Sequence, residues 1–184
     1  MRVISGIAGR RKLVSPPGMD IRPTTDRIKE TLFNILAPYI YDSDFLDLFA
    51  GSGGIGIEAL SRGAGSAVFV DNSNTALNCV KKNLEITGLN SNAEVLRMDA
   101  CAAVSRLYTM RKKFDIIFID PPYKQEIEKN VLFQLDKNRI LKEDGMIIVE
   151  ASSDTGFDYI EDTCFKISRE KKYGSNKHLF IAYK

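Results

Sequence analysis

The residues with the clearest chemical meaning are Asp120, Pro121, Pro122 and Tyr123, which stand together after the apolar run 114–119. Two prolines end a buried strand because neither has an N–H for the sheet ladder, and their carbonyl oxygens stay free as acceptors. The Asp120 carboxylate adds further acceptors, and the ring of Tyr123 can stack on a flat heterocycle. These four candidate catalytic residues therefore suit the exocyclic amino group of a base. A strand-ending turn explains them equally well, so a second motif has to decide.

The second motif runs from Asp47 to Gly56, where an apolar strand gives way to a helix. Its Gly51, Gly53 and Gly56 have the spacing G-x-G-x-x-G, which binds nucleotide-like cofactors at the first strand-to-helix turn of a doubly wound sheet. Asp71 ends the next strand, where a carboxylate can bind ribose hydroxyls. This pattern alone is compatible with NAD.

The acids around the glycines favour S-adenosylmethionine over NAD. Asp47 suits a cofactor that carries an amino group and a sulfonium charge, whereas it would repel the two phosphates of NAD. Asp99 follows the third strand, where an adenine amino group can donate to it. Capping of the following helices explains one or two such acids, but it is less economical for four strand ends in a row. The predicted cofactor-binding residues are Asp47, Phe49, Gly51, Gly53, Asp71, Asn72, Asp99 and Ala100.

Basic residues are concentrated at the start of the chain, although the formal net charge is only +2. The only acidic residues before Glu30 are Asp20 and Asp26. The basic residues in the same segment are Arg2, Arg10, Arg11, Lys12, Arg22, Arg27 and Lys29. Without interleaved aromatic residues, this composition favours phosphate contact only modestly, and a solvated charged face is the alternative. The candidate phosphate-binding residues are Arg10, Arg11, Lys12, Arg22 and Arg27.

These motifs need an α/β framework to bring them together. Short apolar runs predict strands at 44–48, 67–71, 94–98, 114–120 and 146–151. Helical patterns lie between them, from the glycines to 63, from about 74, after 100 and over 127–135. Strand, crossover helix and strand in repetition predict a doubly wound, mostly parallel sheet with helices on both faces. Two alternating stretches within 163–183 flank residues 173–176, which predicts an antiparallel C-terminal hairpin at the sheet edge.

The first part of the chain is predicted to be an appendage to this sheet. The residues up to about Ser15 alternate loosely, which indicates a small N-terminal β-hairpin arm with little core of its own. We therefore divide the chain into a basic arm at 1–24 and a main domain at 25–184. Thr24 or Thr25 can cap the helix that follows, and Pro38 should end that helix at or near residue 37.

Length and composition fit one main domain, because 184 residues of which 44% are hydrophobic can bury a core without disulfides. No apolar stretch reaches the roughly 20 residues of a membrane span, and the start has no signal-peptide core, so we expect a cytoplasmic protein. Cys79, Cys101 and Cys164 lack paired spacing, so we expect reduced, mostly buried thiols and no metal site. His178 is expected on the surface or on an edge strand.

Together these residues resemble the class I S-adenosylmethionine-dependent methyltransferases that modify amino groups, whose signature is a D/N-P-P-Y/F tetrapeptide. More closely, the chain resembles the small-subunit (16S) ribosomal RNA guanine-N2 methyltransferases. The N-terminal part of the likeness is the most specific, since many methyltransferases share the glycine loop. The matching segments are 2–6, 9–13, 22–27, 29–34, 47–53, 58–64 and 120–123.

The resemblance implies a seven-stranded Rossmann-like sheet, S-adenosylmethionine as cofactor, and a bacterial enzyme that methylates guanine N2 in small-subunit ribosomal RNA. It also implies that Asp120 and the Pro121 carbonyl hold N2 while Tyr123 stacks on the base. Fixed acceptors favour a more tetrahedral N2 and hold it in line with the methyl group. The base must leave its stack, so a looped or single-stranded target fits. The basic residues would bind RNA phosphates, free or in assembling 30S particles, and we expect a monomer.

Three other functions remain open. A DNA adenine or cytosine amino-methyltransferase has the same tetrapeptide, but so short a chain lacks a recognition domain. A protein-glutamine methyltransferase is a further alternative, which the basic arm does not support. The chain is also compatible with a non-catalytic RNA-binding or assembly factor on the same scaffold, and cofactor binding would separate that function from an enzyme.

Overall fold

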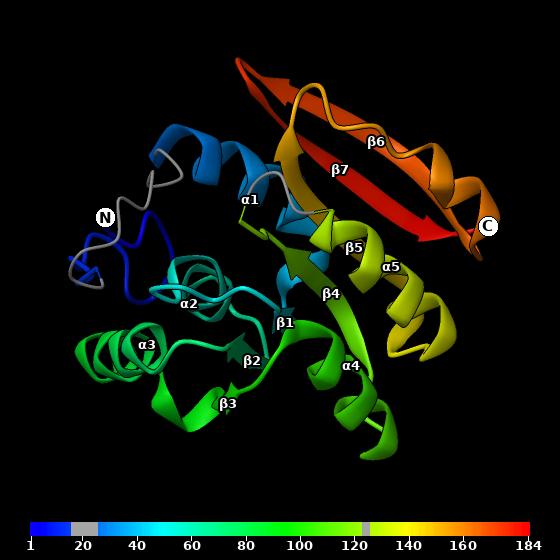
Figure 1. Cartoon of the computed structure of the whole chain (residues 1–184). Coiled ribbons are helices and arrows are strands. Elements are labelled where there is room, and N and C mark those ends of the chain that lie inside the picture. The colour runs from blue at the N-terminus through cyan, green and yellow to red at the C-terminus, as the bar shows by residue number, and fades with distance from the viewer. Residues whose placement is uncertain (16–25, 123–125) are drawn as a thin grey trace.

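The computed structural model describes residues 1–15, 26–122 and 126–184. Its strands are β1 (Asp44–Asp47), β2 (Ser66–Asp71), β3 (Ala93–Arg97), β4 (Phe114–Ile119), β5 (Leu141–Ser152), β6 (Phe165–Tyr173) and β7 (Asn176–Tyr183). They form one seven-stranded sheet in the order β3-β2-β1-β4-β5-β7-β6 (Figure 1). β1 to β5 run parallel, and β7 is antiparallel to both β5 and β6. The predicted mostly parallel sheet with an antiparallel C-terminal hairpin is confirmed.

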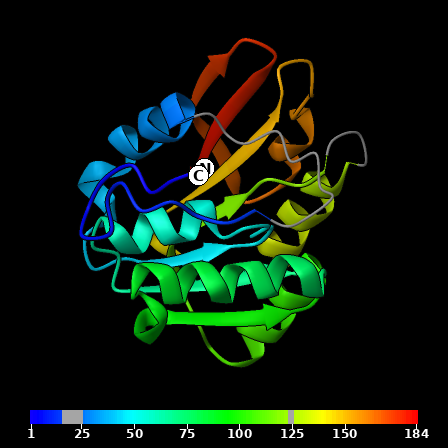
Figure 2. The ribbon, with the colours of Figure 1, turned by 90° about the vertical axis from the view of Figure 1, so that its left-hand side faces the viewer.

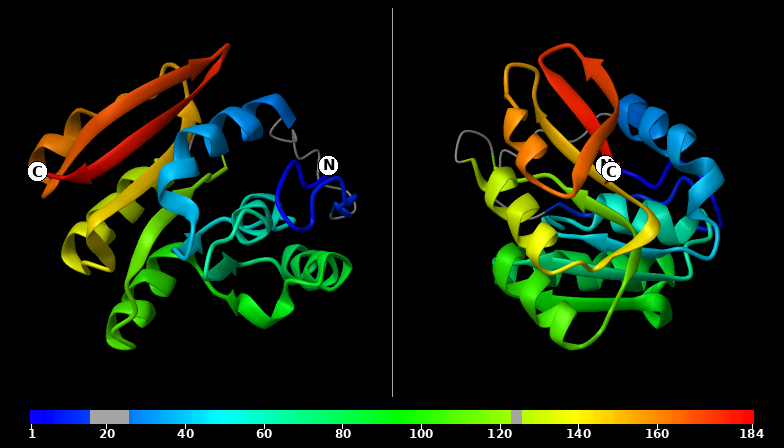
Figure 3. Two further views of the ribbon diagram at one scale, coloured as in Figure 1. Left: turned by 180° about the vertical axis from the view of Figure 1, so that it is seen from behind. Right: turned by 90° about the vertical axis from the view of Figure 1, so that its right-hand side faces the viewer.

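Helices cover both faces of this sheet. They are α1 (Asp26–Ile40), α2 (Gly54–Ser61), α3 (Asn74–Thr87), α4 (Ala100–Thr109) and α5 (Ile127–Lys137), with short 3-10 turns η1 (Asn90–Asn92) and η2 (Asp158–Asp162). α1, α2 and α3 face the viewer in Figure 2, and α4 and α5 face the viewer in the right panel of Figure 3. Alternate strand residues supply the two cores: Phe118 of β4 packs with α1 and α2, whereas Ile117 packs with α4 and α5. The sheet is therefore doubly wound, as predicted.

Residues 1–15 form the predicted small hairpin, since its two stretches pair antiparallel. Three of its residues are buried in the core beneath α1 and α2, namely Val3, Ala8 and Leu13. α2 also binds its backbone, because the Glu58 carboxylate accepts hydrogen bonds from the N–H groups of Ile4 and Ser5 at 2.7 and 3.0 Å. The hairpin is thus fastened to the sheet domain by apolar and polar contacts.

The helix predicted to stop near residue 37 runs on to Ile40 with Pro38 inside it, so that predicted end is wrong. A proline lacks only its own N–H, so its cost is small in a last turn, where few hydrogen bonds follow. Ile40 is 4% exposed, and its burial extends the apolar face of α1 past the proline. The strand predicted from residue 146 also starts earlier, because Leu141 pairs with Phe114 before a register shift.

His178 is neither on the surface nor on an edge strand, so that prediction is wrong. It is 1% exposed on β7, which lies between β5 and β6. An alternating pattern predicts strands but not their order, and here the last strand pairs inward while β6 takes the edge. The three cysteines are free, as predicted, but only Cys79 is buried, whereas Cys101 and Cys164 are half-buried. Among the described residues, no helix has the length and apolar character that crossing a bilayer requires.

Candidate active site

Acidic residues stand at the carboxyl ends of four parallel strands. Asp47 and Asp71 are the last residues of β1 and β2, Asp120 directly follows β4, and Asp99 comes two residues after β3. The carboxyl ends of parallel strands share one edge of a sheet, so the fold brings these four predicted residues to a single edge. The strand order reverses between β1 and β4, and doubly wound sheets bind their ligands in the crevice at such a point.

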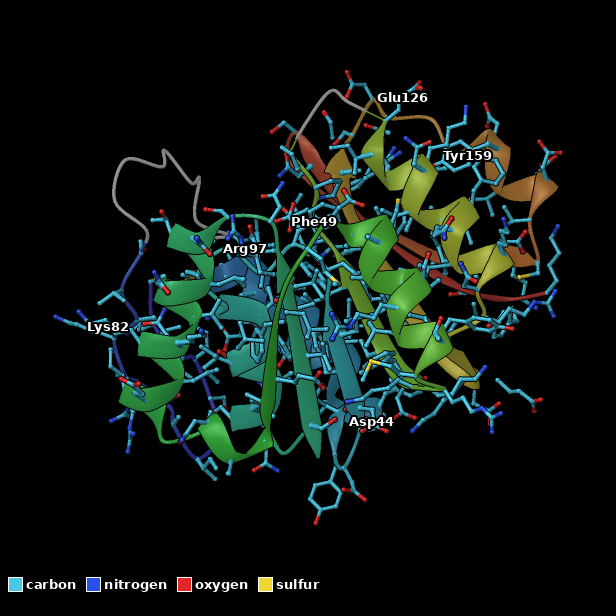
Figure 4. The ribbon with its side chains drawn as sticks, turned by 60° about the horizontal axis from the view of Figure 1, so that its bottom comes forward. Asp44, Phe49, Lys82, Arg97, Glu126 and Tyr159 are labelled. Atoms are coloured by element: carbon cyan, nitrogen blue, oxygen red, sulfur yellow. The ribbon has the colours of Figure 1, made fainter. Side chains whose placement is uncertain are left out.

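The glycine loop joins β1 to α2 at this edge. Phe49, in the loop, lies at the opposite end of the sheet from Asp44, which begins β1 (Figure 4). Gly51 and Gly53 have φ angles of 54° and 80°, in the left-handed region that glycine enters at little cost. A Cβ atom on Gly51 would meet no atom within 4 Å, so open space lies beside the loop backbone. The loop can therefore approach a bound molecule closely.

Asp47 supports the loop from below. It is 1% exposed, and its Oδ2 accepts a hydrogen bond from the N–H of Gly56 at 3.3 Å. Burial raises the pKa of Asp47 to about 7, and the negative charge of Asp71 adds to this, while the N–H groups of Gly56 and Phe49 oppose it. Its Oδ1 has no hydrogen-bond partner among the described residues. Asp47 is therefore poised to change its charge when a cation arrives nearby.

The other predicted cofactor residues lie along the same edge. Asp71 accepts hydrogen bonds from the N–H groups of Gly51 at 2.9 Å and Ser73 at 2.8 Å, so it ties β2 to the loop. Asp99 is exposed and caps α4 by accepting the N–H of Cys101 at 2.8 Å. Helix capping thus accounts for part of its placement, as the alternative explanation held. Asn72 is exposed, and Ala100 is the buried first residue of α4.

Asp120 begins the loop after β4, on the other side of the crevice from the glycines. It is half-buried, and burial raises its pKa well above the usual value, with the nearby charges of Glu150 and then Asp47 adding to the shift. Pro121 and Pro122 line a cavity of about 440 Å³ next to it. Tyr123, the fourth predicted catalytic residue, lies outside the described residues.

The acidic character of this cavity was not predicted from the sequence. Its described lining includes four acids and no lysine or arginine; the acids are Glu126, Glu128, Glu150 and Asp154. Glu150 is 6% exposed, and its Oε2 lies 3.1 Å from Nε2 of His178. The missed signal was its position, because Glu150 closes the apolar run of the strand after that of Asp120. No cluster of three or more His, Cys, Asp or Glu residues suited to a metal occurs within the described ranges.

The family model described as Conserved hypothetical protein 95 matches residues 1–182, nearly the whole chain. The chain belongs to the Conserved hypothetical protein 95 family. Its hairpin, glycine loop and Asp120 segment all lie within the matched range.

Relatives of this family member carry ribosomal RNA methyltransferase names. "Putative rRNA methyltransferase YlbH" of Bacillus subtilis is 46% identical over 150 residues, 82% of each chain. "Ribosomal RNA small subunit methyltransferase D" of Escherichia coli K12 is 36% identical over 174 residues, 95% of this chain and 85% of that protein. The solved structure of "Putative methyltransferase yhhF" from Escherichia coli is 33% identical with a TM-score of 0.83, covering 100% of this chain and 98% of that one. The predicted resemblance and the methyltransferase fold are confirmed.

The described RNA-binding candidates of this Conserved hypothetical protein 95 member lie on two segments, the hairpin and the start of α1. Arg2, which pairs with Lys12 in the hairpin, joins these segments through an ion pair of 2.8 Å with Asp26. Arg10, Arg11 and Lys12 are exposed at the hairpin, and Arg11 Nη1 donates to the carbonyl of Ile86 at the end of α3 at 2.7 Å. Arg27 is exposed in the first turn of α1 and lines a cavity with the β6–β7 turn. Arg22 lies outside the described residues. Lys29, counted in the basic run, is buried and pairs with Glu58 at 3.2 Å, so it is not part of a basic surface.

Proposed function

We propose that this protein transfers a methyl group from S-adenosylmethionine to the exocyclic N2 amino group of a guanine in small-subunit ribosomal RNA. Methyl transfer to this RNA is supported by the names of its relatives. One observation supports the guanine amino group as the methyl acceptor. Asp120 and Pro121 lie at the end of β4, across the crevice from the glycine loop and beside an acid-lined cavity.

The cofactor side of the crevice fits S-adenosylmethionine, which supplies its methyl group as a sulfonium when bound. Gly51 leaves open space beside the loop, and no phosphate-binding cation lies among the predicted cofactor residues. Asp71 and Asp99 would accept hydrogen bonds from the ribose hydroxyls and the adenine amino group. Asp47, beneath the loop, would lose its proton as a positive charge approaches, because an adjacent cation lowers a carboxyl pKa.

Fixed hydrogen-bond acceptors would make the guanine amino group a better nucleophile. The lone pair of a guanine N2 is delocalised into the ring, so N2 is a poor nucleophile. Asp120 and the Pro121 carbonyl would accept its two N–H groups, which favours a tetrahedral nitrogen aimed at the methyl group. After transfer N2 must release a proton, and the raised pKa of Asp120 makes its carboxylate a competent acceptor.

The acidic lining argues for a base rather than a phosphate in the cavity. Four carboxylates make the cavity wall negative, so it would repel the phosphates of the RNA backbone but not an uncharged base. A base can reach this depth only after leaving its stack, so the target lies in a loop or a single strand. We further propose that the protein acts as a cytoplasmic monomer on free RNA or on assembling 30S particles.

Purified protein and methyl-labelled cofactor, incubated with small-subunit RNA and with partly assembled particles, test this function. The label should appear as N2-methylguanosine at one mapped position. Comparing RNA from cells with and without the protein identifies the same nucleotide. Absence of transfer to guanine N2 in every substrate would overturn the proposal, and label on adenine or cytosine would replace it with another base methyltransferase.

A further inference from the structure

Glu150 is a buried acid for which the proposed methyl transfer has no task. Its carboxylate is held on both oxygens: Oε1 lies 3.3 Å from Asn176 Nδ2, and Oε2 lies 3.1 Å from His178 Nε2. His178 is itself fixed by the rings of Tyr173 and Phe118, whose centroids are 5.0 and 6.3 Å away. A buried carboxylate is costly unless it is hydrogen-bonded, so these two contacts indicate a carboxylate kept in one orientation.

Strand register places Glu150 directly beside Asp120. Ile119 of β4 pairs with Val149 of β5, so the next residues, Asp120 and Glu150, are also neighbours. Paired residues on adjacent parallel strands project from the same face of a sheet, with the strands about 4.8 Å apart. Glu150 in turn pairs with His178 on β7. Asp120, Glu150 and His178 thus form a row across three neighbouring strands, with Glu150 lining the cavity in the middle.

Two carboxylates side by side match one base edge in particular. Guanine carries its N2 amino group next to N1–H, so its edge presents adjacent donors. Adenine and cytosine carry their amino groups next to a ring nitrogen that is an acceptor, which a carboxylate repels. Each oxygen of Glu150 has one described donor and two lone pairs, so the carboxylate can still accept from a ligand.

We propose that Glu150 accepts the N1–H of the target guanine and thereby selects guanine, while Asp120 holds N2. This specificity role rests on the proposed guanine N2 methylation. His178 and Asn176 act as positioning residues, because they hold the carboxylate of Glu150 without touching the base. Glu126, Glu128 and Asp154 add negative charge to the cavity but lie on other segments, outside the row of neighbouring strands.

Substitution of the target guanine by 2-aminopurine tests this role. 2-Aminopurine keeps the amino group, but its N1 has a lone pair in place of the hydrogen. The wild-type protein should use RNA containing 2-aminopurine with a kcat/KM about 10- to 100-fold lower than RNA containing guanine, the effect of one hydrogen bond to a charged group. RNA with inosine, which keeps N1–H and lacks the amino group, should compete with the guanine substrate.

Glu150→Gln should reverse this preference in part, because the glutamine amide can donate to N1 of 2-aminopurine. The ratio of kcat/KM for guanine over 2-aminopurine should fall at least about tenfold. Glu128→Gln is the matched control, since it removes the same charge from the cavity wall and should leave the ratio within about twofold. Thermal unfolding and cofactor affinity establish that each variant is folded.

The outcomes are distinguishable. Wild-type protein that methylates 2-aminopurine as well as guanine overturns the role of Glu150, as does a Glu150→Gln ratio equal to that of wild type. The preference of the wild-type protein for guanine over 2-aminopurine and the competition by inosine RNA still test the proposal if Glu150→Gln does not fold. A wild-type protein that modifies no guanine at all instead overturns the proposed function.

Discussion

Asp120 carries the strongest expectation about a single residue, because it combines position with an altered acidity. Asp120→Ala removes an acceptor for the amino group and the group best suited to receive its proton, so methyl transfer should fall by about 10²- to 10⁴-fold. The residue faces the base, so the dissociation constant for S-adenosylmethionine should stay within a few-fold. Single-turnover transfer and calorimetric cofactor titration measure the two quantities.

Asp120→Asn is the informative companion. It keeps one acceptor oxygen but cannot take the proton at any pH. Equal losses in Asp120→Ala and Asp120→Asn would identify proton acceptance as the main role, whereas a milder loss in Asp120→Asn would identify orientation of the amine. A comparable loss of cofactor binding in both would move Asp120 into the cofactor site.

Asp47 makes folding stability depend on pH. Its pKa is raised from 3.8 to about 7 in the folded protein, so folding favours its protonated form. This contribution is fully present below about pH 3.8 and is lost as pH rises through about 7, at most about 4 kcal/mol for a shift of this size. Asp47→Asn should therefore show a shallower decrease in the free energy of unfolding between about pH 4 and 7 than wild type.

Urea unfolding of the cofactor-free protein at several pH values measures this difference. The decrease will not vanish in Asp47→Asn, because burial raises the pKa of Asp120 in the same direction. Parallel pH curves for the two proteins would show that Asp47 ionises normally beneath the loop.

At the scale of the elements, Glu58 joins three of them. Its carboxylate, 0% exposed, accepts the backbone of the N-terminal hairpin and pairs with Lys29 of α1 at 3.2 Å and Arg62 at 2.8 Å. Burial lowers the pKa of Lys29, and Glu58 opposes that shift. Glu58→Ala leaves two backbone N–H groups without their acceptor, and the buried Lys29 ammonium keeps only the Arg2 carbonyl, so the change should cost about 3–5 kcal/mol in the free energy of unfolding.

Glu94→Ala provides the control for Glu58→Ala. It breaks an ion pair of 2.6 Å with Lys112 in which both side chains are more than a third exposed. Such a surface pair should contribute less than about 1 kcal/mol. Similar small losses for the two variants would contradict the role of Glu58 in fastening the hairpin to α1 and α2.

The elements were predictable wherever a local pattern defines them. Period-two and helical patterns and the glycines of the loop located β1 to β4 and α2 to α5, because these elements bury one recognisable face. Two features escaped because they depend on distant partners. The burial of Ile40 carries α1 past Pro38, and the order of β6 and β7 decides that His178 is buried.

In the candidate site, too, the residues defined by a local pattern were predictable and those defined by distant partners were not. Asp47, Asp71 and Asp120 were found because parallel strands place their ends at one edge. Glu150 was not found from the sequence. Its place in the site depends on its strand register with Asp120 and on its contact with His178, 28 residues further along the chain. A local pattern cannot give strand register between elements joined by long connections.

Across the whole molecule, the hairpin runs from the glycine loop, where Met1 Sδ lies 3.9 Å from Ser52 Oγ, toward the far end of α3, where its arginines lie. α3 begins at the proposed catalytic edge, after β2, and its 14 residues span about 21 Å. Arg11 binds the carbonyl of Ile86 at the far end of this helix. Arg27, by contrast, borders a cavity of about 490 Å³ with Lys171 and Lys172 of β6. An RNA that fills the site must therefore be long to reach Arg10 and Arg11 as well.

This distance shapes the expected effect of replacing Arg10 and Arg11 together by alanine. Affinity for whole small-subunit RNA or particles should fall, and the slope of log affinity against log salt should flatten by roughly one unit for each lost phosphate contact. A short RNA that contains only the target loop should bind the variant and wild type equally. Replacing Lys137 and Arg139, exposed around the end of α5, removes equal charge and should leave the slope unchanged.

Salt-dependent binding measured with both RNA lengths separates local contact from general attraction. If the hairpin variant and the α5 variant lose affinity alike, net charge rather than the hairpin attracts the RNA. If the short RNA is weakened as much as the long one, the hairpin contacts RNA close to the target base, and its arginines must then swing away from Ile86 toward the strand ends. An unchanged slope with the long RNA would make Arg10 and Arg11 a solvated face.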